Sequence, residues 1–226
     1  ASIVQYEEKI RPSKLDEIIG RELEKETLKI MINSARRRKE VIDHILFYGP
    51  PGLGKTTFAV AIANEVGASI KITSGPAIER QGDLAAILTG LKKNDVIFID
   101  EIHRLPKVVE EILYPAMEDG MLDIVMGKGP TAKTIRLSLE PFTLIGATTQ
   151  IGKISSPMRD RFGLIHRLDF FSEGDLVEIL KRACRLWNIE IDDDALKSLS
   201  TISRGTARVG LRLLRRCRDY AESKKE

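Results

Sequence analysis

The chain has 226 residues, of which 42% are hydrophobic and 31% are charged, and its formal net charge is +3. This length suits one large domain or a medium domain with a small companion, and the composition is typical of a soluble protein with a hydrophobic core. The charge is too small to indicate nucleic-acid binding by itself. No apolar run approaches the ~20 residues of a membrane span and no signal peptide is visible, so we expect a cytoplasmic protein without membrane contact.

The N-terminal region predicts a loop and a short helical turn over residues 11–20, followed by an amphipathic helix over 22–35. The expected apolar side of this helix consists of Leu23, Leu28, Met31 and Ala35. The basic run 36–39 could contact phosphate, but we interpret it as a solvated face near the helix C-terminus.

A phosphate-binding loop follows, with the sequence Gly49-Pro50-Pro51-Gly52-Leu53-Gly54-Lys55-Thr56-Thr57. It fits the GxxxxGK(S/T) pattern and lies between an apolar run at 44–48, expected to be a buried strand, and a helical pattern over 58–66. Gly52 and Gly54 allow backbone N–H groups to approach phosphate closely. Lys55 would reach the β- and γ-phosphates and Thr56 would hold Mg²⁺. The loop predicts binding of a nucleoside triphosphate.

A second strand is expected at 69–73 and a helix at 83–91, capped by Asp83. The apolar run 96–99 then ends at Asp100 and Glu101. In a nucleotide site, Asp100 would orient the Mg²⁺ shell and Glu101 would polarise the attacking water. The alternative is a solvated strand end with two acidic residues.

A helix is expected at 107–119, followed by strands at 121–126 and 134–139 that are joined by the glycine-containing turn 127–132. This pattern predicts a β-hairpin. From the residues alone, the hairpin is either a surface that meets a partner or a simple connector.

The next buried strand, at 142–146, leads to Thr149, whose hydroxyl could sense the γ-phosphate or position water. Ser156 and Pro157 form a helix start, with Ser156 as the expected cap, and the short helix carries Arg159 and Arg161. A strand at 167–170 is expected to close the sheet.

From residue 173 onward the pattern predicts helices only. One stripe contains Leu176, Leu180, Ala183 and Trp187, a second begins at Ala195, and a third helix starts near Thr206. Cys184 and Cys217 lie in these helices without metal-ligand spacing and are expected to be reduced packing residues. The fold class is therefore α/β: a parallel-sheet P-loop domain over 1–172 and a small all-α domain over 173–226.

In combination these motifs resemble the AAA+ ATPases and, within them, the RuvB family of Holliday-junction branch-migration motors. The resemblance spans about residues 6–220, and the matching segments are 43–46, 49–57, 73–76, 81–88, 98–105, 127–130, 146–149 and 156–163. The resemblance is far more specific than the phosphate loop alone.

The resemblance implies further roles for single residues. Arg161 matches the arginine finger that reaches into the neighbouring subunit's ATP site, Thr149 the first sensor, and Arg208 the second sensor on the lid. A surface ion pair is the alternative role of Arg161. The expected catalytic set is Lys55, Asp100, Glu101, Thr149, Arg161 and Arg208. The expected ATP or ADP contacts are Arg11, Ile18, Ile19, Gly49, Pro51, Gly52, Leu53, Gly54, Lys55, Thr56, Thr57, Phe171 and Arg208, and the expected Mg²⁺ contacts are Thr56 and Asp100.

The implied partners are further copies of the chain in a hexameric ring, a RuvA-like junction-binding protein at hairpin 121–139, and the duplex DNA of a Holliday junction. The sequence departs from the family pattern at Gln150 for Arg, Ala207 for Pro and Phe171 for Tyr. The family also carries a C-terminal winged-helix DNA-binding domain, which the 226 residues do not include. We therefore expect little direct DNA binding by this segment.

The sequence thus predicts an ATP-hydrolysing motor subunit that acts in DNA recombination and repair. Two alternatives remain at this point. One is another AAA+ remodeller, such as a clamp-loader-like subunit. The other is a nucleotide-binding module that does not hydrolyse ATP.

Overall fold

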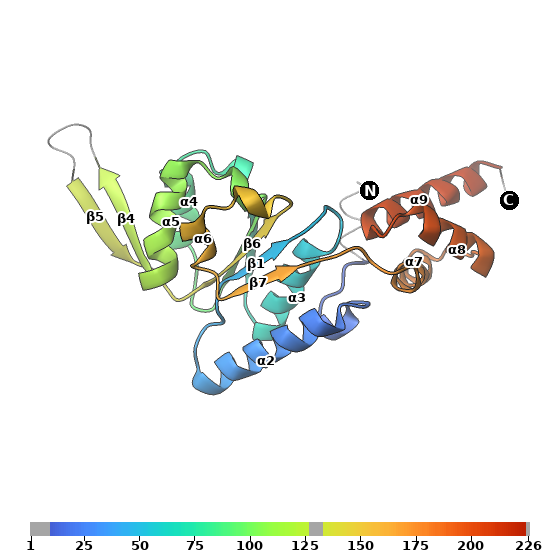
Figure 1. Ribbon diagram of the computed structural model, residues 1–226, viewed down its shortest axis with the longest axis horizontal. Coiled ribbons are helices and arrows are strands. Elements are labelled where there is room, and N and C mark those ends of the chain that lie inside the picture. The colour runs from blue at the N-terminus through green and yellow to red at the C-terminus, as the bar shows by residue number, and fades with distance from the viewer. Residues whose placement is uncertain (1–9, 127–132, 225–226) are drawn as a thin grey trace.

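The computed structural model describes residues 10–126 and 133–224. Within these residues a five-stranded parallel sheet has the strand order β2-β3-β6-β1-β7 (Figure 1). Its strands are β1 (Ile45–Tyr48), β2 (Ile70–Ser74), β3 (Val96–Asp100), β6 (Thr143–Thr148) and β7 (Leu164–Arg167). The predicted α/β class with a parallel sheet is confirmed.

Helices cover both faces of the sheet. Along β3 and the other central strands, alternate side chains enter two different clusters: Ile97 and Ile99 lie in one, and Val96 and Phe98 in the other. The first cluster packs against α4 (Gln81–Thr89), α5 (Lys107–Asp119) and α6 (Ser156–Arg159), and the second against α2 (Glu22–Arg38) and α3 (Lys55–Val66). The result is a three-layer domain whose central strands β3 and β6 are buried on both sides.

Short 3₁₀ turns connect these layers. They are η1 (Leu15–Glu17), η2 (Gly75–Ala77), η3 (Ile102–Arg104) and η5 (Ile151–Lys153). Among the described residues, no helix is long and apolar enough to cross a membrane.

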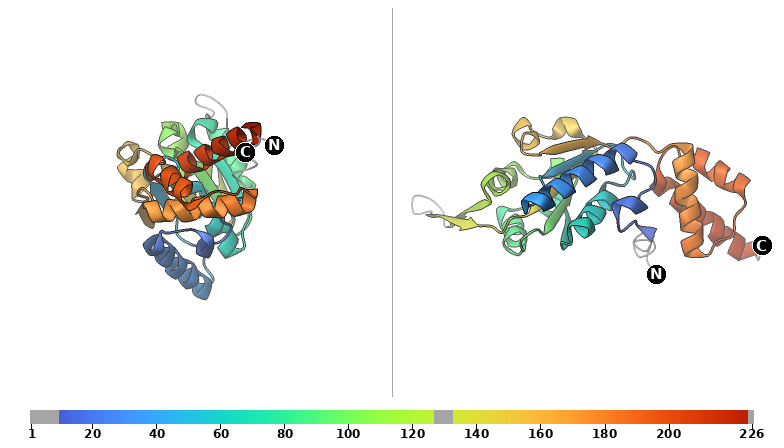
Figure 2. Two further views of the ribbon diagram at one scale, coloured as in Figure 1. Left: turned by 90° about the vertical axis from the view of Figure 1, so that its right-hand side faces the viewer. Right: turned by 90° about the horizontal axis from the view of Figure 1, so that it is seen from below.

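The predicted hairpin is present as β4 (Met121–Met126) and β5 (Lys133–Ser138), which pair antiparallel. It projects from the large domain at the end opposite the C-terminal helices (Figures 1 and 2). Its predicted turn, 127–132, lies outside the described residues.

The C-terminal part is all-helical, as predicted, and consists of α7 (Glu173–Trp187), α8 (Asp193–Ile202) and α9 (Ala207–Lys224). Ser172 and Asp192 cap the first two helices, accepting hydrogen bonds from Asp175 N at 3.1 Å and Ala195 N at 2.7 Å. Their core contains Leu180, Ala183, Leu196, Leu199 and Leu214.

Several local predictions are corrected. Leu23 is 70% exposed, because the buried face of α2 follows Leu28, Ile32 and Ala35 at helical spacing. Cys217 is exposed and only Cys184 of the two cysteines is a packing residue. The basic run 36–39 is exposed at the end of α2, in agreement with a solvated face.

Three element boundaries also differ. Helix α4 begins at Gln81, and Asp83 lies inside its first turn, where its carboxylate accepts from Arg80 N at 2.9 Å. Ser155 rather than Ser156 caps α6, with Oγ accepting from Met158 N at 3.3 Å.

The last strand, β7, spans Leu164–Arg167 rather than 167–170, because its register with β1 ends at Tyr48 and Arg167. The residues after it leave the sheet toward the helical part. Arg161 lies beyond the end of α6, in the turn before β7.

Candidate nucleotide-binding site

The carboxyl ends of β1, β3 and β6 lie side by side at one edge of the sheet. Tyr48 pairs with Thr148, and Ile99 pairs with Gly146. The residues that follow these strands therefore meet: the phosphate loop, the acidic pair 100–101 and Thr149. In open α/β sheets, ligands bind outside these carboxyl ends.

Glycines set the path of the phosphate loop. At Gly49, with φ of 141°, a Cβ atom would lie 2.2 Å from the carbonyl oxygen of Leu168. At Gly52, with φ of 77°, it would lie 2.7 Å from Thr206 Cγ2 and 2.9 Å from Arg208 Cβ. A side chain at position 49 would displace the backbone of Leu168, and one at position 52 would displace the contact of the loop with Thr206 and Arg208. Helix α3 starts directly after the loop, so its free N–H groups face the loop.

Lys55 is a buried cation at the centre of the loop. Its Nζ donates to the carbonyl oxygens of Gly49 at 2.8 Å and Pro50 at 2.7 Å. Burial lowers the pKa of Lys55, Asp100 opposes this shift, and Arg208 adds to it. A desolvated ammonium held beside a helix N-terminus is suited to contact phosphate oxygens.

The acidic pair follows β3 in an unusual backbone conformation. Glu101 has φ of 47° and ψ of 44°, in the left-handed region that few residues other than glycine adopt. Asp100 Oδ1 accepts from Glu101 N at 2.9 Å, and Glu101 Oε2 lies 3.2 Å from Arg104 Nη1. The conformation turns the chain sharply at the point where both acidic residues reach the cavity described below.

Two threonines with different surroundings lie at the end of β6: Thr148 is its last residue and Thr149 follows it. Thr148 is buried, and its hydroxyl accepts from Gln150 N at 2.9 Å and lies 2.8 Å from His103 Nδ1. Burial is the largest cause of the lowered pKa of His103, which favours the neutral ring. Thr149 is exposed at the strand tip. Hydrogen bonds of Thr148 therefore fix the backbone that presents Thr149.

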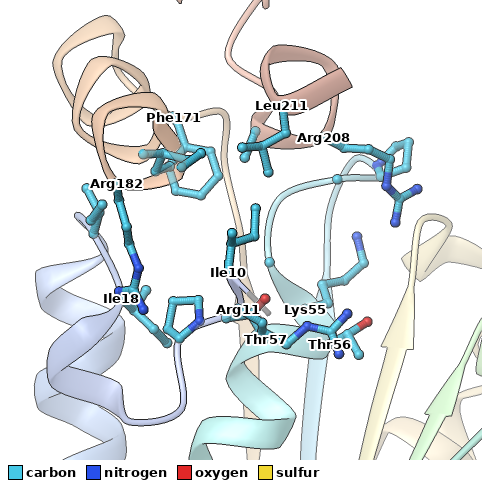
Figure 3. A pocket seen from close by; sticks show the side chains of 18 of the residues that line it. Ile10, Arg11, Ile18, Lys55, Thr56, Thr57, Phe171, Arg182, Arg208 and Leu211 are labelled. Atoms are coloured by element: carbon cyan, nitrogen blue, oxygen red, sulfur yellow. The ribbon is translucent and has the colours of Figure 1, made fainter. Parts of the chain in front are cut away.

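A cavity of about 400 Å³ lies between the phosphate loop and the C-terminal helices (Figure 3). This volume is in the usual range for a small-molecule site. Its apolar lining is Ile10, Pro12, Ile18, Ile19, Pro51, Phe171, Ile179, Ala183, Ala207 and Leu211. Its polar side-chain lining is Arg11, Lys55, Thr56, Thr57, Asp100, Glu101, Thr149, Arg182 and Arg208. An apolar wall beside a cationic, hydroxyl-bearing end suits a base joined to phosphates.

Most of the predicted site residues surround this one cavity. They are Arg11, Ile18, Ile19, Pro51, Gly52, Gly54, Lys55, Thr56, Thr57, Asp100, Glu101, Thr149, Phe171 and Arg208. Gly49, Leu53 and Arg161 are not among the described residues that line it. Gly49 acts through its carbonyl, which binds Lys55, and Leu53 is 1% exposed in the core. Arg161 forms an ion pair with Glu118 instead.

Sequence reasoning missed the contribution of α7 to the cavity. The predicted stripe of α7 packs inside the helical part and reaches the cavity at Ala183. Ile179 and Arg182 lie outside that stripe and also line the cavity. Arg182 Nη1 donates to Glu17 O at 2.8 Å, and its Nη2 lies 3.3 Å from Glu17 Oε2. The sequence signal that could have indicated this contribution is the pair Ile179 and Arg182, which lie one helical turn apart and outside the core stripe of α7.

Arg21 was also missed. Its guanidinium lies over the Phe171 ring, 4.3 Å from the centroid, and its Nη2 donates to Leu53 O at 3.3 Å. Arg21 thereby contacts both the phosphate loop, at Leu53, and Phe171, the aromatic residue that lines the cavity. The spacing of residues within a motif could not indicate this contact, because Arg21 is far from both Leu53 and Phe171 in the sequence.

The cavity also suits a nucleotide-bound Mg²⁺. Thr56 and Asp100 both line it and provide a hydroxyl and a carboxylate, the oxygen ligands that Mg²⁺ prefers. Because Mg²⁺ in such sites takes most ligands from water and phosphate, two protein groups suffice. Across residues 10–126 and 133–224, no cluster of three or more His, Cys, Asp or Glu side chains forms a separate metal site.

The strand, phosphate loop and helix, the acidic pair at the end of β3 and the all-helical lid define a P-loop ATPase of the AAA+ class. Two family profiles match the chain. One is described as the Holliday junction DNA helicase RuvB P-loop domain and matches residues 10–168, and the other as the RuvB AAA lid domain and matches 171–226.

Individual relatives agree with the profiles. The chain is 55% identical over 221 residues to the Holliday junction branch migration complex subunit RuvB of Fusobacterium nucleatum, covering 98% of this chain and 67% of that protein. The structure of the Thermotoga maritima RuvB Holliday junction branch migration motor has a TM-score of 0.85 at 48% identity, covering 96% of this chain and 68% of that one. A single-substitution variant of that protein gives 0.87 at 49% identity, with the same coverage. The chain belongs to the RuvB family.

Proposed function

We propose that the chain is an ATP-hydrolysing motor subunit of a Holliday-junction branch-migration complex in the bacterial cytoplasm. One observation carries this proposal: Lys55, the pair Asp100 and Glu101, and Thr149 from the large domain surround the same cavity as Arg208 from the lid. Hydrolysis that alters contacts at this cavity can therefore alter the angle of the lid. Family membership favours this function over a clamp-loader-like remodeller.

The residues divide the chemistry among them. Lys55 and the N–H groups at the start of α3 bind the β- and γ-phosphates. Glu101 polarises the attacking water and Thr149 orients it. Arg208 contacts the γ-phosphate from the lid. Thr56 would hold Mg²⁺ and Asp100 would orient its shell, and the bound ion would supply charge neutralisation on the phosphates.

The apolar end of the cavity receives adenine. Ile18, Ile19 and Phe171 provide its apolar lining, and Arg11 lines the same cavity. The three departures from the family pattern leave the phosphate contacts in place. Ala207 and Phe171 line the cavity and Gln150 binds Thr148 through its backbone. We propose that these residues change how ADP is retained rather than whether ATP is cleaved.

Catalysis requires neighbouring copies of the chain. Arg161 acts in trans on the ATP site of the next subunit, as in a hexameric ring with head-to-tail contacts. The domain boundary lies at 172/173, so the lid spans 173–226. Hairpin 121–139 binds a RuvA-like protein, which recruits the ring to the duplex DNA of the junction.

The proposal is tested by steady-state ATP turnover against protein concentration. Glu101→Gln should abolish turnover and leave nucleotide binding, while Glu26→Gln, an exposed residue on α2, serves as the control. Turnover per subunit should rise with concentration as subunits assemble. Turnover that persists in Glu101→Gln would contradict the proposed role of Glu101. Wild-type protein that binds ATP without hydrolysing it would instead be a nucleotide-binding module.

A further inference from the structure

Arg161 is held against its own subunit by several contacts. Its Nη2 lies 3.0 Å from Glu118 Oε1, and its Nη1 donates to the carbonyl of Pro157. The guanidinium lies 4.3 Å from the ring centroid of Tyr114. The side chain is 19% exposed. A residue that acts on a neighbouring subunit is thus largely enclosed in the isolated chain.

The aromatic partner of Arg161 is itself fixed in position. The Tyr114 hydroxyl lies 2.9 Å from Glu110 Oε2, to which it donates, and 3.1 Å from Ser155 Oγ. Ser155 is the cap of α6, the helix that precedes Arg161. The ring of Tyr114 therefore joins α5 to the segment that carries the arginine.

Glu118 lies in the last turn of α5, directly before the hairpin. Gly120 ends α5 in a left-handed conformation with φ of 63°, and β4 begins at the next residue. Leu139 N donates to Gly120 O at 2.8 Å and closes the base of the hairpin. Leu122, the second residue of β4, is fully buried. The hairpin and the last turn of α5 are thus one continuous packed unit.

A second contact anchors the same turn to the sheet. His44 Nδ1 accepts from Leu144 N at 2.9 Å, so its Nε2 carries the proton and donates to Met117 O at 3.0 Å. Burial lowers the pKa of His44, which is consistent with this neutral form. The turn that contains Glu118 is therefore fixed between the sheet and the hairpin.

We infer that Glu118 and Tyr114 are positioning residues that hold Arg161 on its own subunit, and that the end of α5 couples the hairpin to Arg161. This inference rests on the proposed role of Arg161 in trans. A triphosphate in the neighbouring site must compete with Glu118 for the same guanidinium. A partner that shifts the hairpin shifts Glu118, and by linkage the release of Arg161 must also loosen the hairpin.

Two structural measurements test the coupling without relying on activity. In Glu118→Gln the charge is lost at nearly constant size, and phenylglyoxal should modify Arg161 about twofold to fivefold faster, as followed by mass spectrometry. Hydrogen exchange at the hairpin base, including Leu139 N, should quicken in both Glu118→Gln and Arg161→Ala. The controls are Glu111→Gln on α5 and Arg159→Ala on α6, both exposed.

Kinetics separate positioning from a purely structural role. In assembled protein, Glu118→Gln should raise kcat about twofold to fivefold and leave KM for ATP unchanged, because Glu118 is not among the described residues lining the cavity. A fall in kcat, or labelling and exchange equal to those of the controls, would overturn the inference. Full turnover in Arg161→Ala would instead contradict the proposed trans role, whereas the labelling and exchange would still report on the contact between Glu118 and Arg161.

Discussion

Arg182 of the lid binds Glu17 of the large domain, although 165 positions separate them in the sequence. Its Nη1 donates to the Glu17 carbonyl at 2.8 Å, and its Nη2 lies 3.3 Å from the carboxylate. Arg182 also lines the nucleotide cavity, so one side chain joins the two walls of the site. The contact supplies a direct route by which lid angle and nucleotide affinity depend on each other.

We expect Arg182→Ala to raise KM for ATP about threefold to tenfold with a smaller change in kcat, since a charge-assisted hydrogen bond at the cavity wall is lost. Arg185→Ala, an exposed position on the same helix, is the matched control. Equal KM values for the two variants would show that the contact does not hold the site closed.

Gly52→Ala tests the close approach of loop and lid. The added Cβ would lie 2.7 Å from Thr206 and 2.9 Å from Arg208, at a positive φ of 77°. Gly67→Ala has a similar φ of 67° but no described atom within 4 Å of the new Cβ, so it reports backbone strain alone. Nucleotide affinity should fall at least tenfold in Gly52→Ala and remain near wild type in Gly67→Ala. Isothermal titration with ADP provides the comparison.

We expect nucleotide binding to weaken at alkaline pH because of Lys55. Burial lowers its pKa, so the ammonium is lost on raising the pH before an exposed lysine would lose it. ATP affinity should fall as pH rises through this lowered pKa, because the neutral amine no longer pairs with phosphate. Lys55→Arg stays charged and should show a shallower decline over roughly pH 7–10. Parallel declines would exclude Lys55 as the titrating group.

The same shift has the opposite effect on stability without nucleotide. Between the lowered pKa of folded Lys55 and the unfolded value of about 10.4, the unfolded chain binds more protons. The contribution of Lys55 to the free energy of unfolding should therefore rise with pH in that window. Denaturant titrations at several pH values, with Lys55→Met as the reference, measure this contribution.

The buried hydroxyl of Thr148 is predicted to position the sensor strand. Thr148→Val leaves Gln150 N and His103 without a partner and should cost about 1–3 kcal/mol of stability and lower kcat. Thr143→Val removes another buried hydroxyl bond, to Ile42 O, at the opposite end of the same strand. Thr143→Val should lose comparable stability and keep its kcat. Equal kcat losses in both would indicate a general effect of destabilisation.

His103 gives this contact a pH dependence. The pKa of His103 is lowered, chiefly by burial, so the folded protein holds the neutral ring where the unfolded chain is still protonated. Stability should accordingly rise with pH from the lowered folded pKa up to the unfolded value of about 6.5. On acidification the ring becomes a cation whose nitrogens can only donate, which changes its contact with the Thr148 hydroxyl, and kcat should fall. Thr148→Val should lack this acidic limb.

The sequence was sufficient to predict the parts of the site that depend on local pattern. The sequence motif of the phosphate loop, with a strand before it and a helix after it, is sufficient to predict the conformation of the loop. Apolar runs in the sequence identify β1, β3 and β6. Their order in the sheet then brings 49–57, 100–101 and Thr149 together. These segments lie together in the structure because backbone topology, rather than side-chain detail, determines their position.

Contacts between distant segments were not predictable in this way. The pairing of Arg182 with Glu17, and of Arg21 with Phe171, depends on how the lid packs against the large domain. The predicted cap of α6 was wrong because two candidate residues, Ser155 and Ser156, are adjacent in the sequence. Only the geometry of the turn distinguishes them. The prediction that Leu23 is buried was wrong because the buried stripe of α2 runs through Leu28 and Ile32 and does not include position 23.

The central claim is that ATP is hydrolysed at a site completed by Arg161 of a neighbouring subunit. Mixing two inactive variants tests it most directly. Arg161→Ala keeps its own site but donates no arginine, and Glu101→Gln donates the arginine but cannot activate water. When the two variants are mixed randomly in equal amounts, about a quarter of the interfaces contain both an intact Glu101 and an intact Arg161. Turnover should therefore recover to about a quarter of the wild-type value. A mixture no more active than its separate components would contradict completion of the site in trans.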